Sequence, residues 1–157
     1  MKENRKAFLT MIAMSELGQA LIDASDNGYN VIVGSTKDNP ILFWSYIDHP
    51  RRKIDLPKLK IKSTAAGRYQ ILARYYDAYK TQLGLPDFGP ESQDLIALQM
   101  IRECKALADV DAGRFAEAVR KCRSRWASLP GAGYGQHENN IDKLQMAYVQ
   151  AGGTLEA

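Results

Sequence analysis

The sequence is poor in cysteine, in long apolar runs and in net charge, and each shortage excludes a class of protein. Its two cysteines, Cys104 and Cys122, form no CxxC pair and have no histidine at metal-ligand spacing, so no metal site is indicated. A free thiol pair is expected, and a disulfide remains the alternative. Cys122 belongs to an apolar helical stripe, which favours an inert packing role.

No apolar segment approaches the roughly 20 residues that a membrane-spanning helix requires. Basic residues precede the first apolar run, as in a secretory signal, but Ser15, Glu16 and Gly18 interrupt that run. No small-residue cleavage pattern follows cleanly. We therefore expect synthesis in a cytoplasm without a signal peptide, and no stable insertion into a membrane.

The net charge is only +3 over 157 residues. Such a mild, dispersed charge argues against nucleic acid as a partner but suits an anionic polymer such as a bacterial wall. The chain has no internal repeat, no low-complexity segment and no linker, so one domain over residues 1–157 is predicted. Neither a metal-ligand set nor a nucleotide-binding loop is present, and no cofactor is expected.

The residue pattern of the N-terminal half of the chain predicts a helix followed by strands. Residues 4–24 read as one helix or a kinked pair interrupted at Gly18. Residues 29–35 and 41–47 are rich in β-branched and aromatic residues and predict a hairpin. The segment 48–62 holds two prolines and many basic residues, which predicts an exposed mobile loop. That loop is either simply solvated or a lid that touches a polar polymer.

The rest of the chain predicts helices. One spans 67–83 and stops at Gly84, and the next begins at Pro90. A third carries one apolar stripe and a last one runs over about 138–151. The residues expected to face the core are Tyr69, Leu72, Tyr76, Tyr79, Leu83, Leu95, Ile96, Leu98, Met100, Ile101, Phe115, Val119, Cys122, Trp126, Ile141, Leu144, Tyr148 and Val149. The fold class is α+β: mostly helical, with a small antiparallel β-sheet or hairpin inserted after the first helix.

Glu16 is the candidate catalytic acid. Phe8, Met11, Ile12 and Ser15 recur at helical spacing, and Glu16 falls on the edge of that stripe. A carboxyl group at the rim of an apolar face is partly dehydrated, which raises its pKa toward the value that a general acid needs near neutral pH. The alternative is a glutamate that merely reaches solvent at a helix edge.

Two further stretches suggest a binding groove. One is STAAGRYQI (63–71), and the other is SLPGAGYGQ (128–136), which joins two helices. Glycines at 131, 133 and 135 exceed what such a connection needs, and they allow the backbone to approach a ligand closely. An ordinary flexible loop is the alternative.

These stretches resemble the lambda-phage type of endolysin, a lytic transglycosylase with a lysozyme-like fold. The resemblance covers nearly the whole chain, and its specificity comes from the order and spacing of eight short motifs. They are RKAFL (5–9), SE (15–16), GYNVIVG (28–34), DHPR (48–51), PKLK (57–60), GRYQ (67–70), DAYKTQLGL (77–85) and WASLPGAGYGQ (126–136).

The resemblance implies an activity and a set of residues. The family cleaves the β-1,4 bond between N-acetylmuramic acid and N-acetylglucosamine and leaves a 1,6-anhydro end. Glu16 stands at the position of the family's acid, and Gln70 at the glutamine of its GxxQ motif in the sugar groove. Gly133 and Tyr134 belong to the lower lip of the cleft, and His49 to the upper lip.

Two departures from the family pattern affect the groove. Tyr75 stands where the family often has tryptophan, and it can stack on a sugar with less area. LGQALIDAS (17–25) replaces a glycine-rich polar segment, so the wall next to Glu16 can differ.

The resemblance also implies peptidoglycan glycan strands as the partner, a monomeric enzyme, and a separate holin. The holin permeabilises the membrane, after which the enzyme reaches the peptidoglycan layer.

The acids of the chain bear on the mechanism. A hydrolytic glycosidase needs two carboxylates. No acid lies beside Gln70 or Tyr134, and Asp48 is the only one in a lip motif. A single-acid reaction on Glu16 is therefore expected. The alternatives are a hydrolytic muramidase with Asp48 or another acid as second carboxylate, and a non-catalytic cell-wall-binding protein.

Overall fold

The structure is a computed structural model that describes residues 1–132 and 139–157. The chain divides into two compact units. Unit 1 comprises Met1–Glu16 and Ala97–Ala157, and unit 2 comprises Leu17–Ile96. The single domain over 1–157 stays a prediction.

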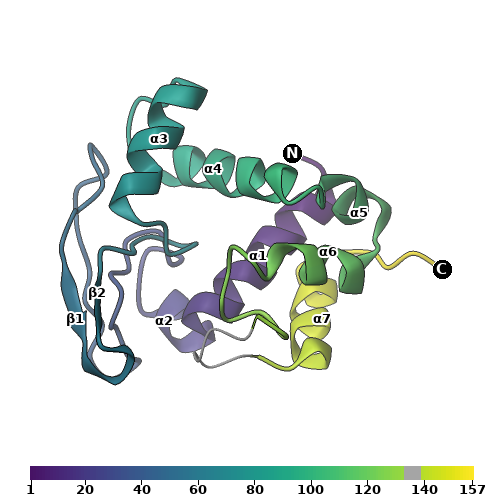
Figure 1. Ribbon diagram of the computed structural model, residues 1–157. Coiled ribbons are helices and arrows are strands. Elements are labelled where there is room, and N and C mark those ends of the chain that lie inside the picture. Colours follow the sequence, from purple (N-terminus) through teal and green to yellow (C-terminus); the bar gives the residue numbers. More distant parts are fainter. Residues whose placement is uncertain (133–138) are drawn as a thin grey trace. The chain divides into compact units, whose positions relative to one another are not determined.

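Helices account for most of the regular structure (Figure 1). They are α1 (Glu3–Leu17), α2 (Gln19–Asp23), α3 (Ala73–Leu83), α4 (Pro90–Glu103), α5 (Leu107–Ala112), α6 (Phe115–Cys122) and α7 (Ile141–Gln150). The short strands β1 (Ile54–Leu56) and β2 (Ile61–Ser63) pair antiparallel and are joined by the 3₁₀ helix η1 (Pro57–Leu59). This order confirms the predicted α+β class. No helix in the described ranges is long and apolar enough to cross a membrane.

The sheet lies where the sequence analysis predicted a loop, so that prediction was wrong for β1 and β2. Polar and apolar residues alternate in the β1 triplet, as in a half-buried strand, whereas β2 has two polar residues after Ile61. Asp55 faces Lys62 across the ladder, which places opposite charges together. Pro57 begins the connection and Lys60 ends it with a left-handed φ of 54°, so the proline costs no ladder hydrogen bond.

The strands predicted over 29–35 and 41–47 form only isolated β-bridges. Val31 bridges to Leu42, but its neighbour bridges to Ala66 instead. Because adjacent residues pair with different segments, neither ladder extends beyond one residue pair. The predicted hairpin is therefore present only as isolated bridges.

Helix boundaries follow the glycine and proline signals in most places. Gly18 separates α1 from α2 with a φ of 78°. Gly84 ends α3 in a left-handed conformation, and α4 begins at Pro90. The helix predicted from Gly67 begins only at Ala73, because the GRYQ motif forms a tight turn.

Gln93 shapes that turn within unit 2. It is fully buried, donates to the backbone oxygens of Tyr29 (3.0 Å) and Phe88 (2.8 Å), and accepts from the backbone N–H of Arg68 at 2.9 Å. A Cβ on residue 67 would lie 2.3 Å from its side-chain oxygen, and φ there is +84°. Only glycine fits Gly67, so α4 fixes the conformation of GRYQ.

The core of unit 1 contains an aromatic trio from three helices. Phe8 of α1, Phe115 of α6 and Tyr148 of α7 have ring centroids 4.8 to 6.5 Å apart. The inward stripe predicted for the α6 region, including Trp126, is buried as expected. Two residues predicted inward are exposed, Leu95 at 43% and Val149 at 46%.

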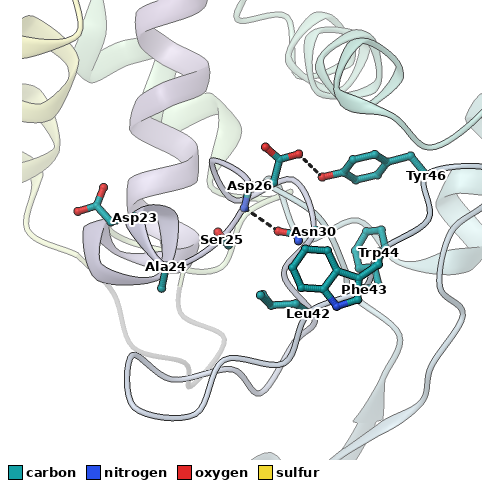
Figure 2. Close-up of a pocket in the computed structure, with 9 residues that line it drawn as sticks. All are labelled: Asp23, Ala24, Ser25, Asp26, Asn30, Leu42, Phe43, Trp44 and Tyr46. Atoms are coloured by element: carbon teal, nitrogen blue, oxygen red, sulfur yellow. Dashed lines mark hydrogen bonds between the residues drawn. The ribbon is translucent and has the colours of Figure 1, made fainter.

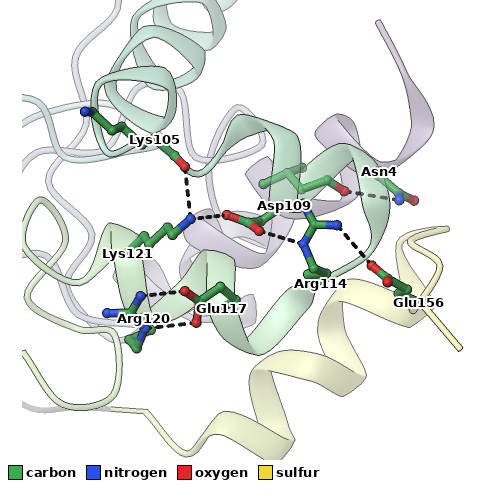
Figure 3. A network of polar contacts seen from close by, with 9 residues as sticks. Asn4, Lys105, Asp109, Arg114, Glu117, Arg120, Lys121 and Glu156 are labelled. Carbon is green, nitrogen blue, oxygen red and sulfur yellow. Dashed lines mark hydrogen bonds and ion pairs between the residues drawn. The ribbon is translucent and has the colours of Figure 1, made fainter.

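A charged network ties α5, α6 and the C-terminal segment within unit 1 (Figure 3). Asp109 is buried, and its carboxylate accepts from Arg114 and from Lys121, each at 2.7 Å. Arg114 also pairs with Glu156 at 3.2 Å. Both hydrogen bonds lower the pKa of Asp109, the one from Lys121 most. The buried acid is thus held ionised by two cations.

Both cysteines are free thiols in unit 1. Cys122 is fully buried, as its place in the stripe predicts. A hydrogen bond from Cys122 lowers the pKa of the Cys104 thiol to about 7.

Candidate active site

Glu16 lies in the last turn of α1, at the edge of a buried stripe. Met11 and Ile12 are fully buried and Phe8 is 1% exposed, which confirms the predicted stripe. Glu16 itself has intermediate exposure. The helix end thus holds the acid at the boundary between the apolar core of unit 1 and the surface.

A buried polar cluster stands beside this acid. The Ser15 and Ser128 hydroxyls are 2.8 Å apart, and both residues are 7% exposed. Asn139 donates from its side-chain nitrogen to the Ser15 backbone oxygen at 2.9 Å and to the Ser15 hydroxyl at 3.1 Å. Its backbone N–H donates to the Ser128 backbone oxygen at 2.9 Å. These three residues, the serine–asparagine cluster, bind the end of α1 to both ends of the segment 129–138.

The environment of Glu16 favours its neutral form. Burial raises the pKa of this carboxyl to about 7, and a hydrogen bond with the Ser128 side chain partly opposes the rise. The partial negative charge at the C-terminal end of α1 acts in the same direction as burial. No cation pairs with Glu16 in the described part of the chain. Near neutral pH the group can therefore both donate a proton and take one back.

Ser128 and Asn139 are site residues that the sequence analysis missed. They lie 113 and 124 residues after Ser15, and only the fold brings them together. The one signal in the sequence was the glycine-rich motif that begins at Ser128. That motif was interpreted through its glycines, and its first residue carries the contact to the acid.

Gln70 adopts a left-handed backbone with a φ of 53° at the end of the GRYQ turn. Its side-chain nitrogen donates to the Gly67 backbone oxygen at 2.8 Å and more weakly to that of Val31 at 3.4 Å. Its side-chain oxygen has no partner among the residues that the structure describes. The amide is therefore fixed by the turn and offers one acceptor to a ligand.

Tyr75 lies on α3 and is 40% exposed. The Arg74 guanidinium stands 4.9 Å from its ring centroid and donates to its hydroxyl at 3.4 Å. The exposed part of the ring is available for stacking, and the expected contact with a sugar stays a prediction.

His49 belongs to the core of unit 2, and its geometry argues against the expected role as a lip residue. It is 2% exposed and packs against Phe88 at 4.8 Å between ring centroids. One ring nitrogen donates to the Ile71 backbone oxygen at 2.8 Å, and the other accepts from the Arg51 backbone N–H at 2.9 Å. With both nitrogens occupied, the imidazole has no free polar atom for a substrate.

Asp48 is engaged by Arg51. Both carboxylate oxygens accept from that guanidinium, at 2.8 and 3.1 Å, and Arg51 makes a second bidentate pair with Asp77. The Arg51 hydrogen bonds hold the pKa of Asp48 below its ordinary value. Gly133 and Tyr134, the other two expected site residues, lie outside the described residues.

Comparison with known proteins places this arrangement in a family. A family model described as Endolysin matches residues 6–155. The chain belongs to the endolysin family. It is 50% identical over 152 residues to the endolysin of Escherichia phage lambda, covering 96% of this chain and 92% of that protein. The endolysin of Escherichia phage P2 is 47% identical over 156 residues, covering 96% and 94%.

Solved structures agree with this membership. Bacteriophage lambda lysozyme complexed with a chitohexasaccharide matches with a TM-score of 0.89 and 47% identity, covering 99% of this endolysin and 98% of that chain. A second structure of lysozyme from bacteriophage lambda matches with a TM-score of 0.85. The lysozyme-like fold is therefore confirmed, and family membership makes this chain a phage-type enzyme of cell-wall lysis that cleaves glycosidic bonds.

Proposed function

We propose that this endolysin is a peptidoglycan lytic transglycosylase whose single catalytic residue is Glu16. It cleaves the β-1,4 bond between N-acetylmuramic acid and N-acetylglucosamine and leaves a 1,6-anhydromuramic acid end. The observation that carries the proposal is a carboxyl group with a pKa of about 7 and no cation beside it in the described residues. Such a group serves as acid and then as base in one turnover.

The reaction balances without water or a second protein group. Protonated Glu16 gives its proton to the glycosidic oxygen as the bond from that oxygen to C1 of muramic acid breaks. The 6-hydroxyl of the same sugar then bonds to C1, and ionised Glu16 takes the hydroxyl proton. The 6-hydroxyl belongs to the same sugar as C1, so proximity lowers the barrier to its attack. An enzyme carboxylate is therefore not needed as the nucleophile. The Ser128 hydroxyl steadies the ionised form of Glu16 between the two steps.

Hydrolysis by a muramidase mechanism is the second candidate. It needs a second carboxylate as nucleophile or as base for a water molecule. Asp48 was the expected candidate, but both its oxygens accept from Arg51 and its pKa is lowered. A carboxylate engaged in this way is a weak base and a hindered nucleophile, which supports the single-acid mechanism.

Gln70 and Tyr75 are proposed as substrate-binding residues. The free side-chain oxygen of Gln70 can accept from an acetamido N–H, and the exposed ring of Tyr75 can stack on a sugar. Gly133 and Tyr134 keep their proposed roles in the groove on the resemblance alone. His49 is instead proposed to support the fold of unit 2.

The glycan strands of peptidoglycan are the proposed partner, since a related lysozyme was solved with a chitohexasaccharide. We further propose that the chain acts as a monomeric single domain after a separate holin has permeabilised the membrane. Light scattering of the purified protein tests the first point, and lysis of cells with and without a co-expressed holin tests the second.

Mass spectrometry of digested sacculi tests the reaction. Anhydro-muropeptides, lighter by one water than reducing-end products, are expected as the main species. Reducing muramic ends as the main species would instead establish the hydrolase. A pull-down with sacculi that retains the protein but releases no soluble fragments would point to a non-catalytic wall-binding protein.

A further inference from the structure

Unit 2 contains a pocket that the proposed mechanism does not use. It is an open pocket with a volume of about 500 Å³, and it is bordered by the chain that follows α2 and by the segment around Trp44 (Figure 2). The volume falls within the range of small-molecule sites, which is about 300–1,000 Å³.

Asn30 supplies the pocket with an unpartnered donor. The residue is 2% exposed, and its side-chain oxygen accepts from the Asp26 backbone N–H at 2.8 Å (Figure 2). Its side-chain nitrogen has no hydrogen-bond partner in the part of the chain that the structure describes. That nitrogen is not completely buried, so it keeps contact with solvent, and Asn30 is one of the residues that line the pocket. A nearly buried amide donor of this kind is expected to find its partner in a ligand.

Asp26 supplies the acceptor. One of its oxygens accepts from the Tyr46 hydroxyl at 2.6 Å, and the other has no partner among the described residues (Figure 2). Burial and the Asp26 carboxylate raise the pKa of Tyr46, so the phenol stays a donor and fixes the carboxylate. Asp23 adds a second carboxylate, and the described residues that line the pocket include no lysine or arginine. The pocket therefore repels anions.

Trp44 supplies an apolar platform. It lines the pocket and is 83% exposed, a large exposed area for an indole. Phe43 behind it is buried and contacts Tyr46 edge to face at 5.7 Å between centroids. The packed rings of Phe43 and Tyr46 thus support the exposed indole of Trp44.

The ligand that matches this set is a neutral pyranose. Such a ring has an apolar C–H face for an indole, and hydroxyls that donate to a carboxylate while accepting from an amide. The N-acetylmuramic acid ring is disfavoured because its lactyl ether occupies the 3-hydroxyl, which then cannot donate to a carboxylate.

We propose that this pocket is a subsite for the N-acetylglucosamine ring of a glycan strand. Trp44 stacks on the sugar, Asp26 accepts from one of its hydroxyls, and Asn30 donates to another. The identity of the strand rests on the proposed function, and the pocket adds selectivity between its two alternating sugars.

Fluorescence of the full chain tests the subsite, because Trp44 and Trp126 are the two tryptophans and Trp126 is 1% exposed. The Glu16→Gln variant is titrated with chitotetraose, and acrylamide quenching reports on the accessible indole. We expect chitotetraose to reduce the quenching constant at least twofold. We also expect the NMR signals of the Trp44 indole N–H and the Asn30 side-chain amide to shift.

Variants in the same background identify the contacts. Trp44→Ala and Asn30→Asp should each weaken chitotetraose binding at least tenfold by NMR titration, and Asn30→Asp keeps the acceptor for Asp26. Ile47→Ala, at a residue 80% exposed that does not line the pocket, is the matched control and should bind normally.

The subsite would be overturned if chitotetraose did not protect Trp44 from acrylamide quenching, or if all variants bound chitotetraose equally. So would binding of a lysine-containing stem peptide in place of chitotetraose, because the pocket would then select ammonium groups. The proposed function is judged separately by the anhydro-muropeptides. Their formation without indole protection overturns only the subsite, and indole protection with reducing-end products overturns only the transglycosylase.

Discussion

Unit 1 contains two carboxyl groups in sheltered surroundings that differ in their neighbours. Asp109 is bonded to Arg114 and Lys121, and these cations lower its pKa. Glu16 has the Ser128 hydroxyl but no cation in the described residues, and burial raises its pKa to about 7. Asp109 therefore stays ionised near neutral pH, whereas Glu16 has a pKa near neutral pH and can gain or lose its proton there.

The difference separates structural from chemical use of a carboxyl group. A buried acid with paired cations contributes to folding when ionised, since breaking the pair leaves uncompensated charge. A buried acid with only neutral neighbours is costly when ionised, and that cost makes it a proton donor near neutral pH. Four predictions, made on three substitutions, test the comparison.

Replacing Glu16 by Gln should have the largest effect. The variant keeps the shape of the side chain but has no proton to give, so the rate of sacculus lysis should fall by at least about 10²–10⁴-fold. Turbidity loss of purified sacculi measures it. Glu3→Gln, at an exposed acid in the first turn of the same helix, should lyse at the normal rate. Lysis by Glu16→Gln within threefold of wild type would remove Glu16 from the mechanism.

The same Glu16→Gln variant should be more stable than wild type at pH 8. The folded-state pKa of about 7 lies above the ordinary value of 4.5, so ionisation favours the unfolded chain as pH rises between these values. The gain should reach about 2–3 kcal/mol above pH 7 and vanish below pH 4.5. Urea unfolding at pH 4 and pH 8 measures the difference. A variant less stable at pH 8 than at pH 4, relative to wild type, would contradict the assigned pKa.

Asp109→Asn should show the opposite pattern. The lowered pKa of Asp109 means that its ionised form stabilises the fold above its ordinary pKa, and that this contribution is lost as pH falls. The variant should lose about 2 kcal/mol at pH 7 and much less near pH 3. Urea unfolding at both values measures the loss. The rate of lysis per folded molecule should stay unchanged. A large fall in that rate would contradict the purely structural role assigned to Asp109.

Ser128→Ala should have the smallest effect. It removes the hydrogen bond that favours ionised Glu16, so the pKa of Glu16 should rise further. The alkaline limb of the pH–lysis profile should move up by about 0.5–1 unit. Ser15→Ala removes a cluster member that leaves the contact between Ser128 and Glu16 in place, and its alkaline limb should not move. Identical shifts in both variants would assign the effect to the cluster as a whole.

The sequence allowed the stripe of α1, the acid at its edge and the helix boundaries at Gly18, Gly84 and Pro90 to be predicted. Each depends on local periodicity or on a residue with special backbone preferences. Local rules placed the strands wrongly, because strand formation depends on which segment lies alongside. Val31 and its neighbour find different partners, whereas the alternating triplet of β1 finds one.

The surroundings of the acid were predicted only in part. The rise in pKa followed from the position of Glu16 on the helix. Ser128 and Asn139 did not, because hydrogen bonds across more than a hundred residues leave no trace in spacing. The sequence also could not show that His49 is buried with hydrogen bonds at both ring nitrogens, which is the geometry that argues against a lip role.

The distance along the chain between Ser15 and Asn139 has a consequence for synthesis. The ribosome makes Glu16 early and its neighbours more than a hundred residues later. At a translation rate of about 5–20 residues per second, the acid waits several seconds before its surroundings exist. A nascent or truncated chain that ends before Ser128 therefore lacks the hydroxyl that favours ionised Glu16 and the side chains that bind the end of α1, so the surroundings of this acid are completed only near the end of synthesis.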